Sequence, residues 1–218
     1  AGLTIVSGML GMAGEDSSTI EAIQRTGGLV PDGTWAANRR AATELARIAA
    51  ELQLTLVTFH AGFIPPAQAD RRRSVLVDRV RTVAGIYSER GVQVALETGQ
   101  ESSAVLEEML VAVDRQQVRV NFDPANLILY GKGDPVAALG ALASWVVQVH
   151  IKDALPAVHE GEWGSEVPVG EGAVDWAAFL GALLACREVK TLVIEREAGS
   201  DRIGDVTRAR HFLESVLR

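Results

Sequence analysis

The stretch VQVALE (92–97) is a short apolar run that ends abruptly at Glu97. Four other apolar runs also end at a potential metal ligand: TLVTFH (55–60), VRVNFD (118–123), VVQVH (146–150) and TLVIE (191–195). Runs of valine, isoleucine and leucine with little polar alternation are typical of parallel strands buried on both faces. The carboxyl ends of such strands carry the chemistry in barrel and open α/β enzymes. The sequence therefore predicts a parallel sheet with a functional edge.

Helical patterns separate these runs. Apolar residues recur at helical spacing within 35–52, 76–87, 106–113, 176–184 and 206–217. A sixth apolar run, LTIVSGM (3–9), precedes all the others and ends without a ligand. Strict alternation of strand and helix indicates parallel βα units with right-handed crossovers. Since no stretch has the composition of a linker, we expect one domain over residues 1–218.

The number of units limits the architecture. An eight-stranded barrel needs eight βα units and typically about 250 residues, whereas six units are recognisable here. The chain is then either an open six-stranded sheet or a barrel whose first two units lie outside it. The regular spacing of the ligand-type residues favours the barrel, which we expect to expose apolar strand edges unless a partner chain completes it.

Composition excludes several classes of function. The formal net charge is −7, which disfavours nucleic-acid binding because phosphate neutralisation supplies most of that affinity. The one basic triplet, Arg71-Arg72-Arg73, is expected to begin a helix with a solvated face. The single cysteine, Cys186, suits a reducing compartment. With no apolar run near the roughly 20 residues of a membrane span and no secretory pattern, we expect a cytoplasmic protein without a membrane partner.

Two long segments interrupt the alternation. Residues 10–34 are rich in glycine and polar residues, with a capping-box pattern at Ser18-Thr19-Ile20-Glu21. Residues 154–175 contain two prolines and several glycines. Both segments follow a strand, so each is either a lid over the functional edge or a surface insertion.

Four of the strand ends form a candidate ligand set. Glu97, Asp123 and His150 are about one βα unit apart, and Glu195 follows one unit and the long loop later. Such side chains can converge on one ion, and three carboxylates with one imidazole suit Mn²⁺, Mg²⁺ or Co²⁺ without excluding Zn²⁺. Each residue also has a plainer interpretation: Asp123 before Pro124 suits a helix cap. The agreement of four strand ends favours the cation site, since buried carboxylates without a cation are costly.

The same residues carry a family resemblance. It extends from about residue 50 to the end through the stretches LVTFHAGFIP, VALETGQE, VNFDPANLILYGKGDP, VQVHIKDA, VPVGEGAVDWAAFL and LVIEREAG. These resemble the xylose-isomerase-like sugar phosphate isomerase/epimerase superfamily. The resemblance implies a (β/α)₈ TIM barrel with one divalent cation, Mn²⁺ first, on Glu97, Asp123, His150 and Glu195. It also implies that the two glutamates exchange the substrate proton.

The chain departs from this family in two respects. The family's first two βα units have no counterpart before Ala1, so the native barrel would be longer or completed by a homo-oligomer. Asn126 stands where ketose epimerases often have histidine, so their sugar specificity does not transfer. Asn126 is a candidate substrate-binding residue, as is His60, which could instead pack in the core. Lys152 would bind a hydroxyl or phosphate, or form a salt bridge with a loop carboxylate.

These observations predict an enzyme of carbohydrate metabolism with a small-molecule sugar substrate. We expect a metal-dependent isomerase or epimerase acting through a cis-enediolate, with Glu97 and Glu195 catalytic. A dehydratase on the same site and a non-catalytic sugar-binding barrel are the alternatives. A three-zinc DNA-repair endonuclease needs more than the four histidines present. A nucleotide-binding sheet would need a glycine-rich phosphate loop after the first strand, which is missing.

Overall fold

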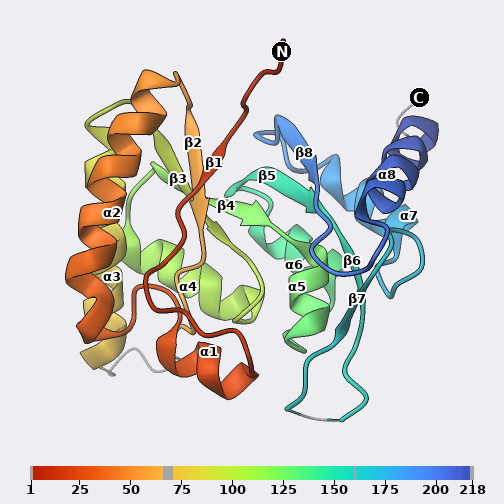
Figure 1. The fold of residues 1–218 in the computed structure, drawn as a ribbon, viewed down its shortest axis with the longest axis horizontal. Coiled ribbons are helices and arrows are strands. Elements are labelled where there is room, and N and C mark those ends of the chain that lie inside the picture. Colours follow the sequence, from red (N-terminus) through yellow and green to blue (C-terminus); the bar gives the residue numbers. More distant parts are fainter. Residues whose placement is uncertain (1, 66–70, 160, 217–218) are drawn as a thin grey trace. The chain divides into compact units, whose positions relative to one another are not determined.

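In the computed structural model, which describes residues 2–65, 71–159 and 161–216, the main sheet has six parallel strands. Its order is β1-β2-β3-β4-β5-β8. The strands are β1 (Gly8–Met9), β2 (Leu56–Phe59), β3 (Gln93–Glu97), β4 (Val118–Phe122), β5 (Val146–Ile151) and β8 (Thr191–Ile194). Helices separate them along the chain, which confirms the predicted α/β class with six βα units (Figure 1).

The chain forms two compact units. The first contains Ala1–Glu97 and Ala104–Val120, and the second contains Thr98–Ser103 and Asn121–Arg218. The boundary crosses β4, so neither unit is separated from the other by a linker. The single-domain assignment stays a prediction.

The first unit holds α1 (Ile20–Thr26), α2 (Asp32–Glu51), α3 (Arg71–Ser88) and most of α4 (Ser103–Val113). Helices α2 and α3 lie side by side (Figure 1). The small residues Ala42, Ala46 and Ala49 recur every three or four positions and are fully buried, so α2 packs closely on its neighbours. Strands β2 and β3 pair in register, with Val57 opposite Val94.

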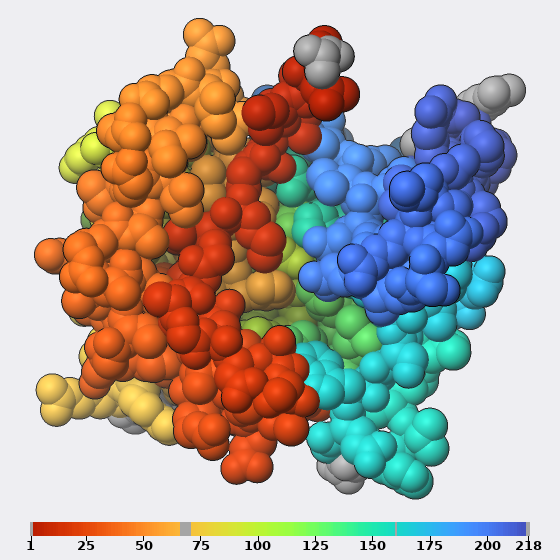
Figure 2. Space-filling model, in the orientation of Figure 1, coloured from red at the N-terminus to blue at the C-terminus, as the bar shows by residue number. Residues whose placement is uncertain are grey.

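The first strand is shorter than predicted. We expected residues 3–9, but only Gly8 and Met9 pair, with Val57 and Thr58 of β2. Residues 2–7 pair with no strand of the described chain, and Leu3 is 86% exposed. Figure 2 shows this segment in red at the surface of the first unit. An apolar run forms a strand only where a neighbouring strand supplies hydrogen bonds, and β2 begins too late to supply them here.

The second unit holds α5 (Pro124–Leu129), α6 (Pro135–Leu142), α7 (Trp176–Leu183) and α8 (Arg202–Val216). Its core is aromatic: the rings of Phe122 and Phe179 lie 5.8 Å apart, and Trp176 contacts Phe179 edge-on at 5.6 Å. Strands β5 and β8 are parallel, with His150 opposite Val193. Among the described residues, none of the helices is both long and apolar enough to cross a membrane.

The long segment 154–175 is ordered by a single carboxylate. Its beginning, β6 (Asp153–Leu155), pairs antiparallel with β7 (Ser165–Val167) in its middle, which the sequence patterns did not predict. The buried Asp153 accepts hydrogen bonds from five donors: the amides of Ala154, Gly170, Gly172 and Val174 and the indole of Trp176. Asp153 therefore holds both the first residue of this segment and its last part, residues 170–174, close to the end of β5.

The segment 10–34 is also held by specific contacts. Asn38 of α2 accepts from the amide of Ala13 at 2.7 Å and donates to the carbonyl of Gly28 at 3.3 Å. Gly28 has a φ of +69°, and a Cβ there would lie 2.1 Å from the carbonyl oxygen of Ala61. Helix α1 is capped by Thr19, whose hydroxyl accepts from the Ala22 amide. The cap therefore lies one residue after the predicted Ser18.

Candidate metal centre

Asp123 uses its two carboxylate oxygens differently. It is completely buried and is the N-cap of α5, where Oδ1 accepts from the Asn126 amide at 2.9 Å and Pro124 occupies the first helical position. Oδ2 makes no hydrogen bond within the described residues and faces Nδ1 of His150 at 3.5 Å. The helix-cap interpretation and the ligand interpretation of Asp123 thus apply to different oxygens of the same carboxylate.

His150 is oriented by a chain of amides. Its Nε2 lies 3.0 Å from Nδ2 of Asn121, and the side-chain oxygen Oδ1 of Asn121 accepts from Nε2 of Gln148 at 3.3 Å. All three residues are buried. A contact at one ring nitrogen fixes the plane of an imidazole and directs the other nitrogen. Here Nδ1 is directed toward the carboxylates of Asp123 and Glu195.

Glu195 directly follows β8, and its amide donates to the carbonyl of Ile151 at 3.2 Å. Its Oε2 lies 3.1 Å from Nδ1 of His150 and 3.1 Å from Nζ of Lys152. Burial opposes its charge, but His150 and Lys152 together hold the pKa of the Glu195 carboxyl below its usual value. The group therefore stays ionised, as a metal ligand or a general base requires.

Lys152 lies among the same carboxylates. Its side chain is 2% exposed, and Nζ contacts Glu197 at 2.6 Å, Glu195 at 3.1 Å and Asp123 at 3.8 Å. Burial opposes its charge, yet these three carboxylates raise the pKa of Lys152 well above its usual value. The structure thus shows Lys152 in ion pairs with carboxylates, while its contact with substrate stays a prediction.

Glu97 and His60 end neighbouring strands. The pairing of Phe59 with Leu96 aligns β2 and β3, and Nε2 of His60 lies 3.6 Å from Oε1 of Glu97. Thr98 follows Glu97 directly; its amide donates to the Asn121 carbonyl at 3.1 Å. The Thr98 hydroxyl exchanges hydrogen bonds with the backbone of Asp123 at 2.7 and 3.0 Å. Glu97 therefore stands in the chain next to a residue held tightly on Asp123.

Three side chains of the second unit, Asp123, His150 and Glu195, belong to a group that could hold a metal ion, and the predicted fourth ligand, Glu97, ends the first unit. Two carboxylates and one imidazole fit a divalent cation chemically. The two carboxylates carry more negative charge than the single ammonium of Lys152 offsets. The buried Oδ2 of Asp123, which no hydrogen bond of the described chain satisfies, is the kind of atom that a cation would satisfy.

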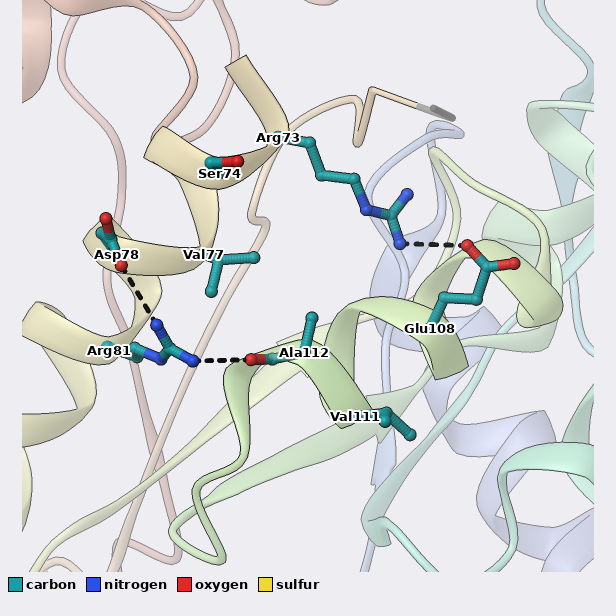
Figure 3. A pocket seen from close by; sticks show the side chains of 8 residues that line it. All are labelled: Arg73, Ser74, Val77, Asp78, Arg81, Glu108, Val111 and Ala112. Carbon is teal, nitrogen blue, oxygen red and sulfur yellow. Dashed lines mark hydrogen bonds and ion pairs between the residues drawn. The ribbon is translucent and has the colours of Figure 1, made fainter. Parts of the chain in front are cut away.

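A cavity in the first unit does not share this chemistry. It has a volume of about 420 Å³ and lies between α3 and α4 (Figure 3). Its charged groups are paired: Arg73 with Glu108, and Arg81 with Asp78 and the Ala112 carbonyl. Arg73 is buried and also donates to the Pro65 carbonyl, so only Arg71 and Arg72 of the triplet are exposed as expected. None of the predicted site residues lines this cavity.

Several residues that hold the ligands in place were not predicted from the sequence. Asn121 and Gln148 each lie two positions before a ligand, Asp123 and His150 respectively. Side chains two apart on a strand share a face, so this spacing was a usable signal. Thr98 and Asp153 gave no such signal, because their partners lie far along the chain.

Comparison with known proteins defines the family. The sequence model of the xylose isomerase-like TIM barrel family matches residues 2–216. The chain belongs to this family. The family and its TIM-barrel fold were therefore predicted correctly from the sequence. Comparison with the curated proteins gave no match.

Solved structures agree. A xylose isomerase domain protein from Planctomyces limnophilus is 34% identical, with a TM-score of 0.91 over 98% of this chain and 76% of that one. A family protein from Mycobacterium smegmatis in complex with magnesium is 19% identical (TM-score 0.74; 99% and 74% covered). The 3-keto-D-glucoside 4-epimerase of E. coli is 18% identical (TM-score 0.72; 98% and 80% covered). The last two, at this identity, show the fold alone.

Proposed function

We propose that the chain is a metal-dependent isomerase or epimerase that moves a proton on a carbon next to a sugar carbonyl. One observation carries the proposal: within the second unit, Glu195 Oε2 and Asp123 Oδ2 lie 3.1 and 3.5 Å from the same ring nitrogen of His150. Carboxylate oxygens and a ring nitrogen that face one another in this way suit a shared cation.

The proposed ligands are Glu97, Asp123, His150 and Glu195, and Mn²⁺ is the first candidate, ahead of Mg²⁺, Co²⁺ and Zn²⁺. When bound, the cation supplies Lewis-acid polarisation of the substrate carbonyl. The residues then have separable tasks. Asp123 holds its ligand oxygen rigidly through the α5 cap, and Asn121 keeps Nδ1 of His150 directed at the centre.

Glu97 and Glu195 are the proposed proton carriers. Glu195 has a lowered pKa and is ionised at neutral pH, so it can accept the proton of the α-carbon. The resulting cis-enediolate is reprotonated by the other glutamate. Return of the proton to the opposite face of the same carbon gives epimerisation, and return to the neighbouring carbon gives isomerisation. Each glutamate must keep one oxygen free of the cation for this task.

Three further residues are proposed to contact the substrate. His60 contacts Glu97 and retains a buried Nδ1 that has no hydrogen-bond partner in the described chain. Asn126 follows Asp123 by one helical turn on α5, and Lys152 would hold Glu195 in position while reaching a substrate oxygen. The 3-keto-D-glucoside 4-epimerase of E. coli acts, as its name says, on a keto-glucoside, which supports a sugar substrate. A cytoplasmic location and a homo-oligomeric state stay predictions.

The test is exchange of a carbon-bound proton. The protein is stripped with a chelator, reloaded with Mn²⁺ and incubated with a panel of ketoses and keto-glycosides in D₂O, and NMR measures deuterium on carbon. We expect incorporation that chelation abolishes and that Glu97→Gln and Glu195→Gln each reduce by at least about 100-fold. Loss of water with deuterium exchange would indicate the dehydratase alternative. Sugar binding without exchange on any substrate would leave the non-catalytic barrel and contradict the proposal.

A further inference from the structure

The loop after β3 contains a buried amide with an unused acceptor. Gln100 is 5% exposed, and its Nε2 donates to the hydroxyl of Tyr130 at 3.4 Å. Its carbonyl oxygen is buried and has no hydrogen-bond partner within the described residues. An unsatisfied buried oxygen costs free energy, so a native protein that keeps one commonly uses it for a ligand or water.

An aromatic pair stands beside this amide. The rings of Tyr130 and Trp163 meet edge-to-face, with centroids 4.6 Å apart, and both side chains are only half-buried. Trp163 is held there because the amide of the next residue, Gly164, donates to the Leu129 carbonyl at 3.1 Å. Any side chain at Gly164 would collide with the Leu155 carbonyl, since a Cβ would lie 2.5 Å from it. The position of the backbone at Gly164 therefore keeps Trp163 in contact with Tyr130.

The amide and the aromatic pair are connected to the proposed metal centre through helix α5. Gly99, with a φ of +147°, packs so closely on α5 that a Cβ would lie 2.5 Å from Cβ of Asn126 and 3.4 Å from the Tyr130 ring. Helix α5 has Asp123 as its N-cap and Tyr130 as its C-cap, and the Tyr130 amide donates to the Asn126 carbonyl. Asn126 and Tyr130 therefore share a helix face, and Tyr130 lies at most about 10 Å along the axis from Asp123.

We propose that Gln100, Tyr130 and Trp163 form a subsite for an uncharged sugar ring or similar hydroxyl-bearing group, at the end of the substrate distal to the reacting carbons. An amide oxygen pairs with a hydroxyl, which can donate, and not with a phosphate oxygen, which only accepts. Aromatic rings suit the apolar face of a pyranose, which carries only C–H groups. The inference rests on the proposed function and names its substrate class: a glycoside or oligosaccharide rather than a free sugar phosphate.

The experiment measures binding to the intact protein by calorimetry. The probes are methyl β-D-glucopyranoside, cellobiose and glucose 6-phosphate, each titrated with and without Mn²⁺. We expect cellobiose to bind most tightly and glucose 6-phosphate most weakly. Gln100→Leu and Trp163→Leu should each weaken cellobiose binding by about tenfold or more. Gln100→Glu keeps an acceptor oxygen and should retain binding within about threefold of the native protein.

Trp145→Leu is the matched control, because Trp145 is half-buried like Trp163 but directly precedes β5, at the amino end of the strand. It should leave cellobiose affinity unchanged. Unchanged Mn²⁺ affinity in all variants shows that they fold. The subsite is refuted if no neutral probe binds, if Gln100→Leu and Trp163→Leu bind like the native protein, or if glucose 6-phosphate binds best. If only the subsite proposal is wrong, the native protein still catalyses deuterium exchange on a keto sugar. If the proposed function is wrong, the native protein catalyses no exchange on any substrate.

Discussion

Nδ1 of His150 lies 3.1 Å from Oε2 of Glu195, across two paired strands whose amide and carbonyl groups fix the separation. The contact explains how a largely buried glutamate can stay ionised. It also means that His150 faces an acidic partner on one side and the neutral Asn121 amide on the other. The amide chain therefore fixes the plane of the ring, with Nδ1 on the side of the carboxylates.

The first prediction concerns this amide chain. Asn121→Leu removes the contact at Nε2 of His150 and should lower Mn²⁺ affinity by about 10–100-fold, because the ring loses its orientation. Asn121→Asp replaces the amide nitrogen beside Nε2 by a carboxylate oxygen, which can accept a hydrogen bond from a protonated Nε2, and should lose less. Calorimetric titration measures both. Native affinity in Asn121→Leu, with normal thermal unfolding, would show that Asn121 does not orient the ligand.

The second prediction concerns Asp153, whose two oxygens accept from five donors. Asp153→Asn replaces one oxygen by a donor and leaves two or three buried groups unsatisfied. We expect a loss of about 3 kcal/mol in the free energy of unfolding and a fall in Tm of about 6–12 °C, measured by circular dichroism. Glu162→Gln, an exposed change in the same loop, should have no effect. Equal melting of the two variants would contradict this account.

The third prediction is a pH dependence. Burial raises the pKa of Glu101 to about 8, against the opposing charge of Lys132. The folded protein then binds a proton that the unfolded chain has released, so this group makes the protein less stable as pH rises from about 5 to about 8. Glu101→Gln removes that loss. Its stability relative to the native protein should increase by up to about 1.4 kcal/mol per pH unit in this interval.

Urea denaturation across this pH range checks the Glu101 prediction. The exposed Glu188 provides the control, and Glu188→Gln should follow the native curve. A constant difference between Glu101→Gln and the native protein at all pH values would show that Glu101 is ionised in the folded state.

The strand ends were predictable from sequence, while their partners were not. Apolar runs and their spacing identified the ends at Glu97, Asp123, His150 and Glu195, because buried parallel strands leave a plain hydrophobic signal. The residues that hold these ends, such as Glu166 on the amides of Glu197 and Ala198, are about thirty positions away. No local sequence pattern predicts such a pairing, since it depends on the tertiary fold that brings the two segments together.

Two aspartates show the same limit at the level of single atoms. Asp123 and Asp134 both precede proline and both cap a helix through Oδ1. Only the strand before Asp123 distinguishes them in the sequence. In the structure Asp123 is buried with Oδ2 facing His150, whereas the Asp134 cap is exposed. The cap is thus a local property, and the ligand oxygen is a property of the fold.

These two aspartates provide the most direct test of the metal centre: Mn²⁺ titration of Asp123→Asn and Asp134→Asn. Both changes replace the capping carboxylate of a helix by an amide, which can also cap, but only the first removes a proposed ligand charge. The native protein should bind one Mn²⁺ per chain, and Asp123→Asn and His150→Gln should lose at least about 100-fold in affinity. Asp134→Asn and His159→Gln, which alter exposed residues, should bind as the native protein does. A native protein that binds no divalent cation, or equal affinity in the two aspartate variants, would contradict the account.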